Sequence, residues 1–383
     1  MMRTVKIIFS LLALVTGLCQ CKQTYVSPYT SPPTGYLVVE GYITGNGPTS
    51  FTLSRTIPLP GDSTIPVVTG AQLQVEGSDN SVYPLIEQGN GVYTIDTLAL
   101  STTVQYRLRI NTPNGEKYLS DFGTYKITPA IDSISWTVDG NGVNIYANTH
   151  DPANATRYYQ WQYVETWEYH SAEESAFEYR SDTTPVMVLN RPPQDQIFRC
   201  WHTDASTRLL LGSSAKLAKD VIYLQLLNQI PSGSQQISVR YSILVSQYAL
   251  TDSAYNFLTL MQKNTESLGT IFDAQPSQLV GNIHCLNNPV EPVIGYVSAG
   301  TMQQQRIFIS RSQVPPWGYS YTCPIPDTLV ANQQDSLKKY FGNLGYDPVD
   351  FNPMVMAWIS NLISCVDCRL QGGTNVDPSY WPN

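Results

Sequence analysis

The sequence predicts a mainly β protein, with an N-terminal immunoglobulin-like β-sandwich followed by a second β-rich domain that carries a few short helices. Two observations lead to this prediction. Only 14% of the residues are charged, and Thr, Ser, Val, Tyr, Gly and Pro dominate, as is typical of strands and turns rather than helices. Gly and Pro also recur at short, regular intervals between apolar segments, as in all-β sandwiches.

The first domain is predicted over residues 36–128. It opens with the strand YLVVEGYI at 36–43, the turn GNGPTS at 45–50 and the strand FTLSRTI at 51–57. Further short strands follow, and NTPNGE at 111–116 is a hairpin connection with Gly where a positive φ is needed. The Cys-Trp-Cys signature of true immunoglobulin domains is absent, so the prediction concerns the architecture alone.

The second domain is predicted over residues 129–383. Helical insertions are expected near 252–267, where Asp252 or Ser253 can cap the helix, and near 335–345. One strand in YYQWQYVETWEYH alternates strictly in its middle. Its two faces carry Trp161, Tyr163 and Glu165 on one side and Gln160, Gln162 and Val164 on the other.

The N-terminus has the features of an export signal. Arg3 and Lys6 form a short basic region, and an apolar stretch of about a dozen residues follows at 7–18. A helix needs ~20 apolar residues to span a bilayer, so this stretch is too short. We therefore expect residues 1–20 to be a signal peptide.

The signal ends at cysteine rather than at an A-x-A site, which is typical of bacterial lipoproteins. Cys21 is the preferred lipidation site because Leu18 occupies its minus-three position, although Gln20 replaces the usual small residue before it. Cys19 is the competing site, and an ordinary signal peptide is the remaining alternative. Residues 21–35 then form a lipidated, Pro-rich tether.

The charge balance argues against nucleic acid and anionic lipid head groups as partners. Removing residues 1–20 takes away two of the 22 basic residues and none of the 30 acidic residues. No later segment is apolar enough to cross a membrane. Membrane attachment is therefore expected through the N-terminal acyl chains alone, and two or three chains give stable anchoring.

Five cysteines remain when Cys21 is lipidated, so at least one of them is unpaired. The C-x-x-C pair near the C-terminus could hold a metal, run redox chemistry or enter disulfides, and an exported protein favours disulfides. A bridge within the pair would be strained. We expect one of the two to hold the C-terminal tail to the body, with Cys323 as the preferred partner, and we expect no metal or cofactor. The disulfide candidates are Cys200, Cys285, Cys323, Cys365 and Cys368.

A possible ligand or partner contact is formed by aromatic residues beside a cluster of glutamates in ETWEYHSAEESAFEY. Aromatic rings with carboxylates nearby can bind a cation or a sugar, but a solvated acidic loop between aromatic strands gives the same pattern. The aromatic candidates are Trp161, Tyr163, Trp167 and Tyr169. The glutamates are Glu165, Glu168, Glu173, Glu174 and Glu178.

The tripeptide Asp-Ser/Thr followed by a small or apolar residue is several times more frequent than the roughly two occurrences that composition predicts. It resembles the O-glycosylation acceptor of exported Bacteroidota proteins, and a glycan would solubilise the surface. Asp-Ser/Thr also suits turns and helix caps for structural reasons. The candidate acceptors are Ser63, Thr97, Ser133, Thr183, Ser253, Thr328 and Ser336.

The order of several short motifs resembles the domain-of-unknown-function forty-two-forty-nine family of Bacteroidota outer-membrane lipoproteins. The motifs are a lipoprotein cysteine, LVVEGYI, YQWQYVETWEY, FRCW, HCLNNPVEPVIGYVSAG and CVDCRLQGGTNVDPSYW. Such proteins are commonly encoded beside a TonB-dependent receptor, so the resemblance implies a lipid-anchored accessory of that transporter in the outer membrane, at the cell surface. The residues after Cys21 are not the acidic ones that often direct such lipoproteins to the surface.

The chain is therefore expected to be a non-catalytic partner of a TonB-dependent transporter in nutrient uptake. The alternative is a stand-alone surface adhesion or structural module. A glycan-acting hydrolase is a remote third alternative, because it would need two carboxylates that face each other across a cleft and nothing in the sequence supports such a pair. No nucleophile elbow, Walker loop, Rossmann glycine pattern or H-E-x-x-H motif occurs.

Overall fold

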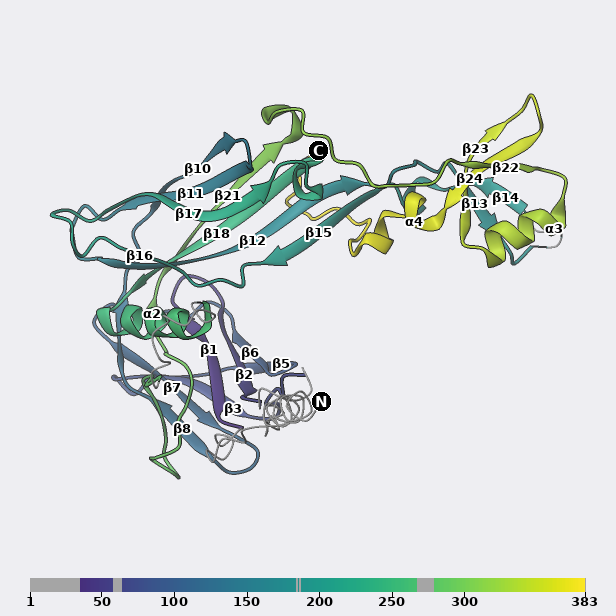
Figure 1. Cartoon of the computed structure of the whole chain (residues 1–383). Helices are drawn as coiled ribbons and strands as arrows, with labels where there is room; N and C mark the ends of the chain where they lie inside the picture. The colour runs from purple at the N-terminus through teal and green to yellow at the C-terminus, as the bar shows by residue number, and fades with distance from the viewer. Residues whose placement is uncertain (1–34, 58–63, 184, 186, 267–278, 383) are drawn as a thin grey trace, which may run out of the picture.

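The chain folds into two β-sandwiches and a smaller lobe that projects to one side (Figure 1). This computed structural model describes residues 35–57, 64–183, 185, 187–266 and 279–382. Cys19, Cys21 and Ser63 therefore lie outside the described residues. The mainly β fold class with few short helices is confirmed.

The first sandwich is built mainly from the N-terminal strands, which lie in two layers around one core. One layer contains β1 (Leu37–Thr44), β2 (Thr49–Arg55), β6 (Val92–Ile95) and β5 (Ile86–Gly89). The other contains β4 (Val82–Pro84), β3 (Gln72–Gly77), β7 (Gln105–Asn111) and β8 (Lys117–Ser120). β9 (Gly123–Lys126) pairs with β7 and leads toward the first layer.

Two strands from much later in the chain complete this sandwich. β20 (Ala299–Gly300) lies between β1 and β9 and is parallel to both, and β19 (Ile283–Cys285) pairs with β8. Val293 and Val297 from the same segment enter the core of the first sandwich. The sequence placed residues 283–300 in the second domain; this was wrong, because the partner of a strand edge need not be close in sequence.

Alternation along β1 decides which side chains fill this core. Leu37, Val39 and Ile43 are buried inside, whereas Glu40 and Tyr42 lie on the opposite face of the strand. Gly41 is required for a steric reason. A Cβ at this position would collide with the Phe51 ring and the Ser50 carbonyl oxygen.

The second sandwich packs a three-stranded sheet on a larger sheet around a core rich in aromatic residues. The three-stranded sheet contains β10 (Ile131–Asp139), β11 (Gly142–His150) and β17 (Val221–Pro231). The larger sheet contains β15 (Arg199–Ala205), β12 (Tyr158–His170), β18 (Arg240–Leu250) and β21 (Met302–Ser310), with β16 (Leu210–Ser213) also paired to β12. A short 3₁₀ turn, η2 (Gln235–Ile237), precedes β18, and another, η3 (Arg311–Gln313), follows β21.

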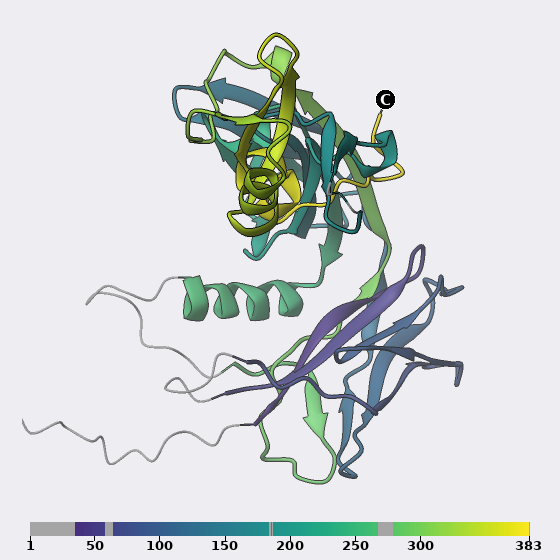
Figure 2. The same ribbon diagram turned by 90° about the vertical axis from the view of Figure 1, so that its right-hand side faces the viewer.

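The chain passes between the two sandwiches three times, which joins them closely. β9 leads to β10, β20 leads directly to β21, and α2 (Asp252–Glu266) follows β18 and precedes β19. The first two connections are joined by two hydrogen bonds, in which the backbone N–H and the hydroxyl of Thr128 donate to the hydroxyl and the carbonyl oxygen of Thr301. α2 lies between the sandwiches, as Figure 2 shows, and it matches the helix expected near 252–267.

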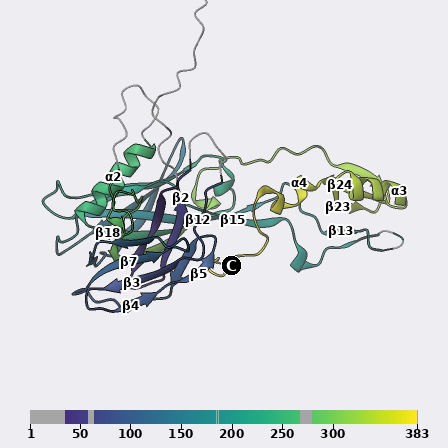
Figure 3. The ribbon, with the colours of Figure 1, turned by 90° about the horizontal axis from the view of Figure 1, so that it is seen from below.

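The C-terminal lobe is the third unit, and it projects far from the first sandwich (Figure 3). It combines the hairpin β13 (Phe177–Arg180) and β14 (Met187–Asn190) with the sheet of β22 (Asp327–Val330), β24 (Ala357–Leu362) and β23 (Tyr346–Asn352). α3 (Gln334–Leu337) and the π-helical turn η4 (Lys338–Asn343) fall within the second helical insertion expected from the sequence. The buried centre of this lobe is small: Leu329, Leu337 and Phe341.

Two short helical segments join the lobe to the second sandwich. They are α4 (Ile363–Val366) and η5 (Cys368–Gln371). The 3₁₀ turn η1 (Pro193–Asp195) lies in the connection from β14 to β15. The residues expected as one second domain thus divide between the second sandwich, the lobe and the end of the first sandwich. Within the described residues, every helix is too short or too polar to cross a bilayer.

Candidate functional site

Four aromatic residues of β12 were predicted as a contact surface, and this prediction was wrong for Trp161, Trp167 and Tyr169. Trp161 and Tyr169 have no exposed surface, and Trp167 is 6% exposed, because all three belong to the core of the second sandwich. Tyr163 is half-buried against the same core. Alternation defines the two faces of a strand correctly, but it does not say which face another sheet will cover.

The glutamates of the same region do not form one site. Glu165 lies inside the second sandwich and accepts hydrogen bonds from Tyr241, Asn228 and Gln236. Burial raises the pKa of Glu165, and the hydrogen bond from Tyr241 only partly opposes this effect. Glu165 is thus a buried carboxyl whose hydrogen-bond donors among the described residues are all neutral.

Glu168 points to the outer face of β12, where the C-terminal tail covers it. It accepts hydrogen bonds from the Trp381 indole and from Arg199. Burial alone would raise the pKa of Glu168, but the hydrogen bonds from His170, Trp381 and Arg199 lower it to about 2. In the described part of the chain, no three His, Cys, Asp or Glu side chains gather as a metal site would require.

The described cysteines form two disulfides, and both hold the C-terminal region. Cys323 pairs with Cys365, as preferred from the sequence, and Cys368 pairs with Cys200 on β15. The C-x-x-C pair therefore has a structural role, with each cysteine bonded elsewhere. Cys285 is free and buried in the core of the first sandwich.

The candidate glycosylation sites differ in accessibility. Thr97, Ser253 and Thr328 are exposed, whereas Ser133, Thr183 and Ser336 are half-buried. The hydroxyl of Ser133 accepts a hydrogen bond from Asn148, and that of Thr183 donates to the Arg180 carbonyl. The exposed three remain predicted acceptors.

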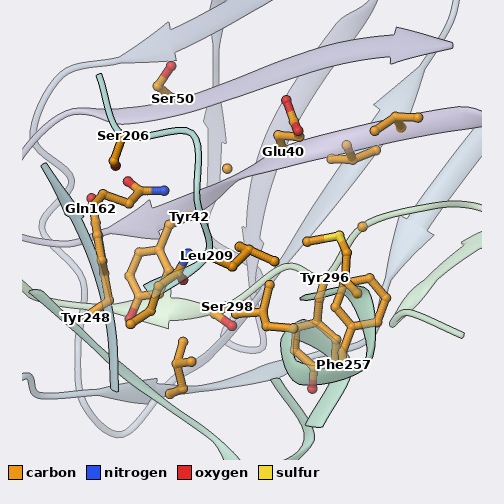
Figure 4. A pocket seen from close by; sticks show the side chains of 18 of the residues that line it. Glu40, Tyr42, Ser50, Gln162, Ser206, Leu209, Tyr248, Phe257, Tyr296 and Ser298 are labelled. Carbon is orange, nitrogen blue, oxygen red and sulfur yellow. The ribbon is translucent and has the colours of Figure 1, made fainter. Parts of the chain in front are cut away.

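A cavity lies where the two sandwiches meet, and we call it the junction cavity. Its volume is about 620 Å³. Figure 4 shows Glu40 on β1 apart from Gln162 and Ser206, with Tyr42 and Tyr248 next to each other near Gln162 and with Phe257 and Tyr296 at another side. Its lining also includes Val38, Thr44, Pro48, Ser50, Gln160, Thr207, Arg208, Leu209, Leu250, Leu258, Met261, Ile294, Gly295 and Ser298.

Strand and helix periodicity explain how these side chains reach one space. Val38, Glu40 and Tyr42 alternate with core residues, so they share the outer face of β1. Gln160 and Gln162 likewise share the outer face of β12. On α2, Phe257, Leu258 and Met261 lie on one side of the helix and close the cavity.

Two tyrosines from different sandwiches meet in the wall of the junction cavity. The rings of Tyr42 and Tyr248 lie 4.9 Å apart, and the Tyr42 hydroxyl donates to the Ala249 carbonyl at 3.4 Å. Burial raises the pKa of Tyr42 far above its usual range, with the neighbouring Tyr248 acting in the same direction. The phenol therefore stays neutral and acts as a donor.

Sequence reasoning missed this cavity. Its walls come from strands, a loop and a helix that are distant in the sequence, and no local motif links them. The only available signal was the exposed-face alternation of YLVVEGYI, which marks Glu40 and Tyr42 as non-core residues. Nothing in that stretch indicates that β12 and α2 lie opposite.

Residues 23–306 match the family described as Domain of unknown function (DUF4249). The chain belongs to this family. The matched span contains both sandwiches except for the end of β21, and it stops before most of the C-terminal lobe.

The other comparisons add little. No curated protein matches the chain. Among solved structures, the chicken interferon gamma receptor alpha chain is 9% identical, with a TM-score of 0.14, and the match covers 57% of this chain and 90% of that chain. A chitinase from Bacillus thuringiensis is 15% identical, with a TM-score of 0.15, and the match covers 53% and 29%. Scores this low support no argument about fold or activity.

Proposed function

We propose that this DUF4249 member is a non-catalytic outer-membrane lipoprotein that partners a TonB-dependent transporter. Acyl chains on Cys21 would confine it to the plane of the receptor, which raises the effective concentration of each partner for the other. It would present captured nutrient to the transporter at the cell surface. The family resemblance suggests the partner, and the junction cavity supports a role in capture.

The lining of the junction cavity is the observation that carries this proposal. It contains aromatic rings, amides and hydroxyls, with Glu40 as its one carboxylate and Arg208 as its one cation among the described lining residues. Hydrolysis of a glycosidic bond commonly uses two carboxylates that face each other. A concave, mainly neutral lining of this kind favours binding over acid–base chemistry.

The test is a pull-down from the native outer membrane. The full chain, with an affinity tag after Asn383, is extracted in mild detergent, and the co-purifying proteins are identified and quantified by mass spectrometry. We expect a TonB-dependent receptor in stoichiometric amount. The absence of any barrel protein at every detergent strength would overturn the partnership.

The matched control replaces both candidate lipidation sites, Cys19→Ala and Cys21→Ala. This variant should leave the membrane fraction and lose the receptor, because confinement to the membrane plane is lost. A variant that stays bound to the membrane would contradict the acyl anchor. An intact-mass measurement on the purified chain would report both the acyl groups and any O-linked glycan on Thr97, Ser253 or Thr328.

One observation favours the second candidate, a stand-alone adhesion or structural module. The turn between β23 and β24 exposes three consecutive apolar residues at the far end of the C-terminal lobe: Met354, Val355 and Met356. A protruding apolar tip is typical of a contact surface. If the receptor is absent from the pull-down, this second candidate predicts that the double variant Met354→Ser/Met356→Ser weakens adhesion of the cells to a surface or to one another, while the protein stays in the membrane.

A further inference from the structure

We propose that the junction cavity binds a short peptide with free ends, with Arg208 holding its carboxylate and Glu40 holding its ammonium group. The inference goes beyond the transporter partnership, because it concerns what the purified protein binds by itself. It rests on two unpaired charges, on the polar groups between them and on the rigidity of the walls.

Arg208 is the first observation. Among the arginines of the described ranges, it is the one whose guanidinium has no hydrogen bond, ion pair or ring contact. It is exposed and lines the cavity from the loop between β15 and β16. A guanidinium presents parallel N–H donors that match a carboxylate in a bidentate geometry. Arg208 is therefore available to a ligand anion.

Glu40 is the second observation, and it lies on the opposite sandwich. Its side chain is exposed on the cavity face of β1, and within the described residues it forms no ion pair. Figure 4 shows Glu40 separated from Ser206, which is near Arg208 in sequence. A ligand with one positive end and one negative end can satisfy both side chains when it lies across the junction.

The neutral groups between these charges fit peptide units. Gln160 and Gln162 each offer an amide that can donate and accept, and Ser206 and Ser298 add hydroxyls. Gly41 has no side chain, so the β1 backbone forms part of the wall. Peptide groups need donors and acceptors in alternation, which this mixture supplies.

The aromatic and aliphatic walls would take the side chains of the peptide. Tyr42, Tyr248, Phe257 and Tyr296 provide ring surfaces from three separate elements and one loop. A neutral oligosaccharide could use the rings and amides but would leave Arg208 and Glu40 unused. A fatty acid could pair with Arg208 but would leave the amides facing hydrocarbon, which is unfavourable.

The cavity has suitable size and stiffness for such a ligand. Its volume of about 620 Å³ falls within the ~300–1,000 Å³ typical of ligand sites. The connections between the sandwiches are hydrogen-bonded to each other at Thr128 and Thr301, which limits movement of one wall against the other. A preformed site loses less free energy to ordering when it binds.

The experiment is isothermal titration calorimetry on the full chain purified in mild detergent. The probe is the tetrapeptide Ala-Ala-Phe-Ala with free ends, compared with its N-acetylated form and its C-amidated form. We expect the free peptide to bind and each blocked form to bind about tenfold more weakly, because each has lost one charge-assisted contact.

Variants then assign each end of the peptide. Arg208→Gln should weaken the free peptide about tenfold and leave the affinity for the C-amidated peptide unchanged. Glu40→Gln should weaken the free peptide about tenfold and leave the affinity for the N-acetylated peptide unchanged. Lys263→Gln is the matched control: it also removes one charge, from an exposed position of α2 outside the cavity lining, and should leave every affinity unchanged.

Two results would overturn the inference. The first is no binding of the tetrapeptide in any form, or binding that neither end-blocking nor Arg208→Gln changes. The second is binding of maltotetraose, used as a neutral probe of similar length, in place of the peptide. Since no transporter is present in this assay, its failure is distinguishable from failure of the pull-down.

Discussion

The first sandwich and the C-terminal lobe reach stability by opposite means. The first sandwich has an extensive core, with Leu37, Phe51, Leu53 and Tyr93 fully buried, and its one described cysteine is unpaired. In the described part of the lobe, the buried apolar cluster contains three residues, and the link between the lobe and the body carries the two disulfides. Of these two units, the one with the smaller apolar core is the one that the disulfides hold, although Cys200 and Cys368 themselves lie in the core of the second sandwich.

The physical reason is the ratio of surface to volume. A small unit buries too little apolar area to offset the conformational entropy of its chain, and disulfides compensate by restricting the unfolded state. The first sandwich needs no such help because its two layers bury a continuous core. The following predictions test this difference, from the largest expected effect to the smallest.

Leu53→Ala should lower the free energy of unfolding of the first sandwich by about 3–5 kcal/mol, because it leaves a cavity in a fully enclosed core. The matched change in the lobe, Leu329→Ala, should cost about 2 kcal/mol, because the smaller and more open core can collapse around the space. Hydrogen exchange measured on peptides from each unit separates the two effects. Equal losses in both units would contradict the comparison.

Replacing the disulfide in Cys323→Ser/Cys365→Ser should destabilise the lobe by about 2–4 kcal/mol, because the unfolded chain gains the freedom of a loop with a sequence separation of 42. Exchange should accelerate in β22 to β24 and stay unchanged in β1 and β2. Cys285→Ser, which removes no cross-link, separates loss of a thiol from loss of the bond. Global unfolding in the disulfide variant would show that the lobe supports the whole body.

The two units should respond to acid with opposite sign. In the lobe, burial raises the pKa of Asp347 to about 6, and this outweighs the nearby Arg191 guanidinium. A raised pKa favours the folded state below the unfolded value near 3.8, and this contribution is lost as pH rises through about 6. Lowering the pH from 7 to 4 should therefore stabilise the lobe by about 2–3 kcal/mol, and Asp347→Asn should remove this response.

In the first sandwich, burial alone would raise the pKa of Glu76, but hydrogen bonds from Arg109, Gln74 and Arg107 lower it to about 2. A lowered pKa gives stability above the unfolded value near 4.5, and this contribution is lost as pH falls through about 2. Between pH 4.5 and 2 we therefore expect the first sandwich to weaken. The check is hydrogen exchange measured as a function of pH, separately for peptides of each unit. A loss of stability in both units on acidification would contradict the prediction.

Met354→Ser/Met356→Ser at the lobe tip should change the stability of either unit by less than about 0.5 kcal/mol, because both side chains are already exposed. Thermal unfolding followed by circular dichroism checks this. A clear loss of stability would mean that the tip packs against something in the folded protein.

Sequence reasoning predicted local features well and distant pairings poorly. Alternation of side chains along the sequence predicted strands and the two faces of β12, and turn-forming residues predicted hairpins. The odd number of cysteines after residue 21 predicted that at least one is unpaired, and Cys285 is unpaired. The Cys323–Cys365 disulfide was preferred because an exported chain favours bonding and a C-x-x-C bridge is strained.

The features that sequence reasoning missed depend on contacts between distant segments. Which face of β12 is buried depends on the β11 and β17 sheet, which no residue of β12 specifies. The pairing of β20 with β1 depends on a strand of only two residues, too short for any periodic signal. The junction cavity depends on both pairings, and so it was not predicted.

The origin of β19 and β20 has a consequence for how the protein is made. A ribosome releases β1 early and β20 only after all of the second sandwich except β21. Until then one edge of β1 lacks its native partner, and an open strand edge readily pairs with other chains. Assembly of the first sandwich must wait for a late segment, which makes its folding slow and non-local. A nascent chain that stopped before residue 283 would be left with an unfinished, aggregation-prone sheet.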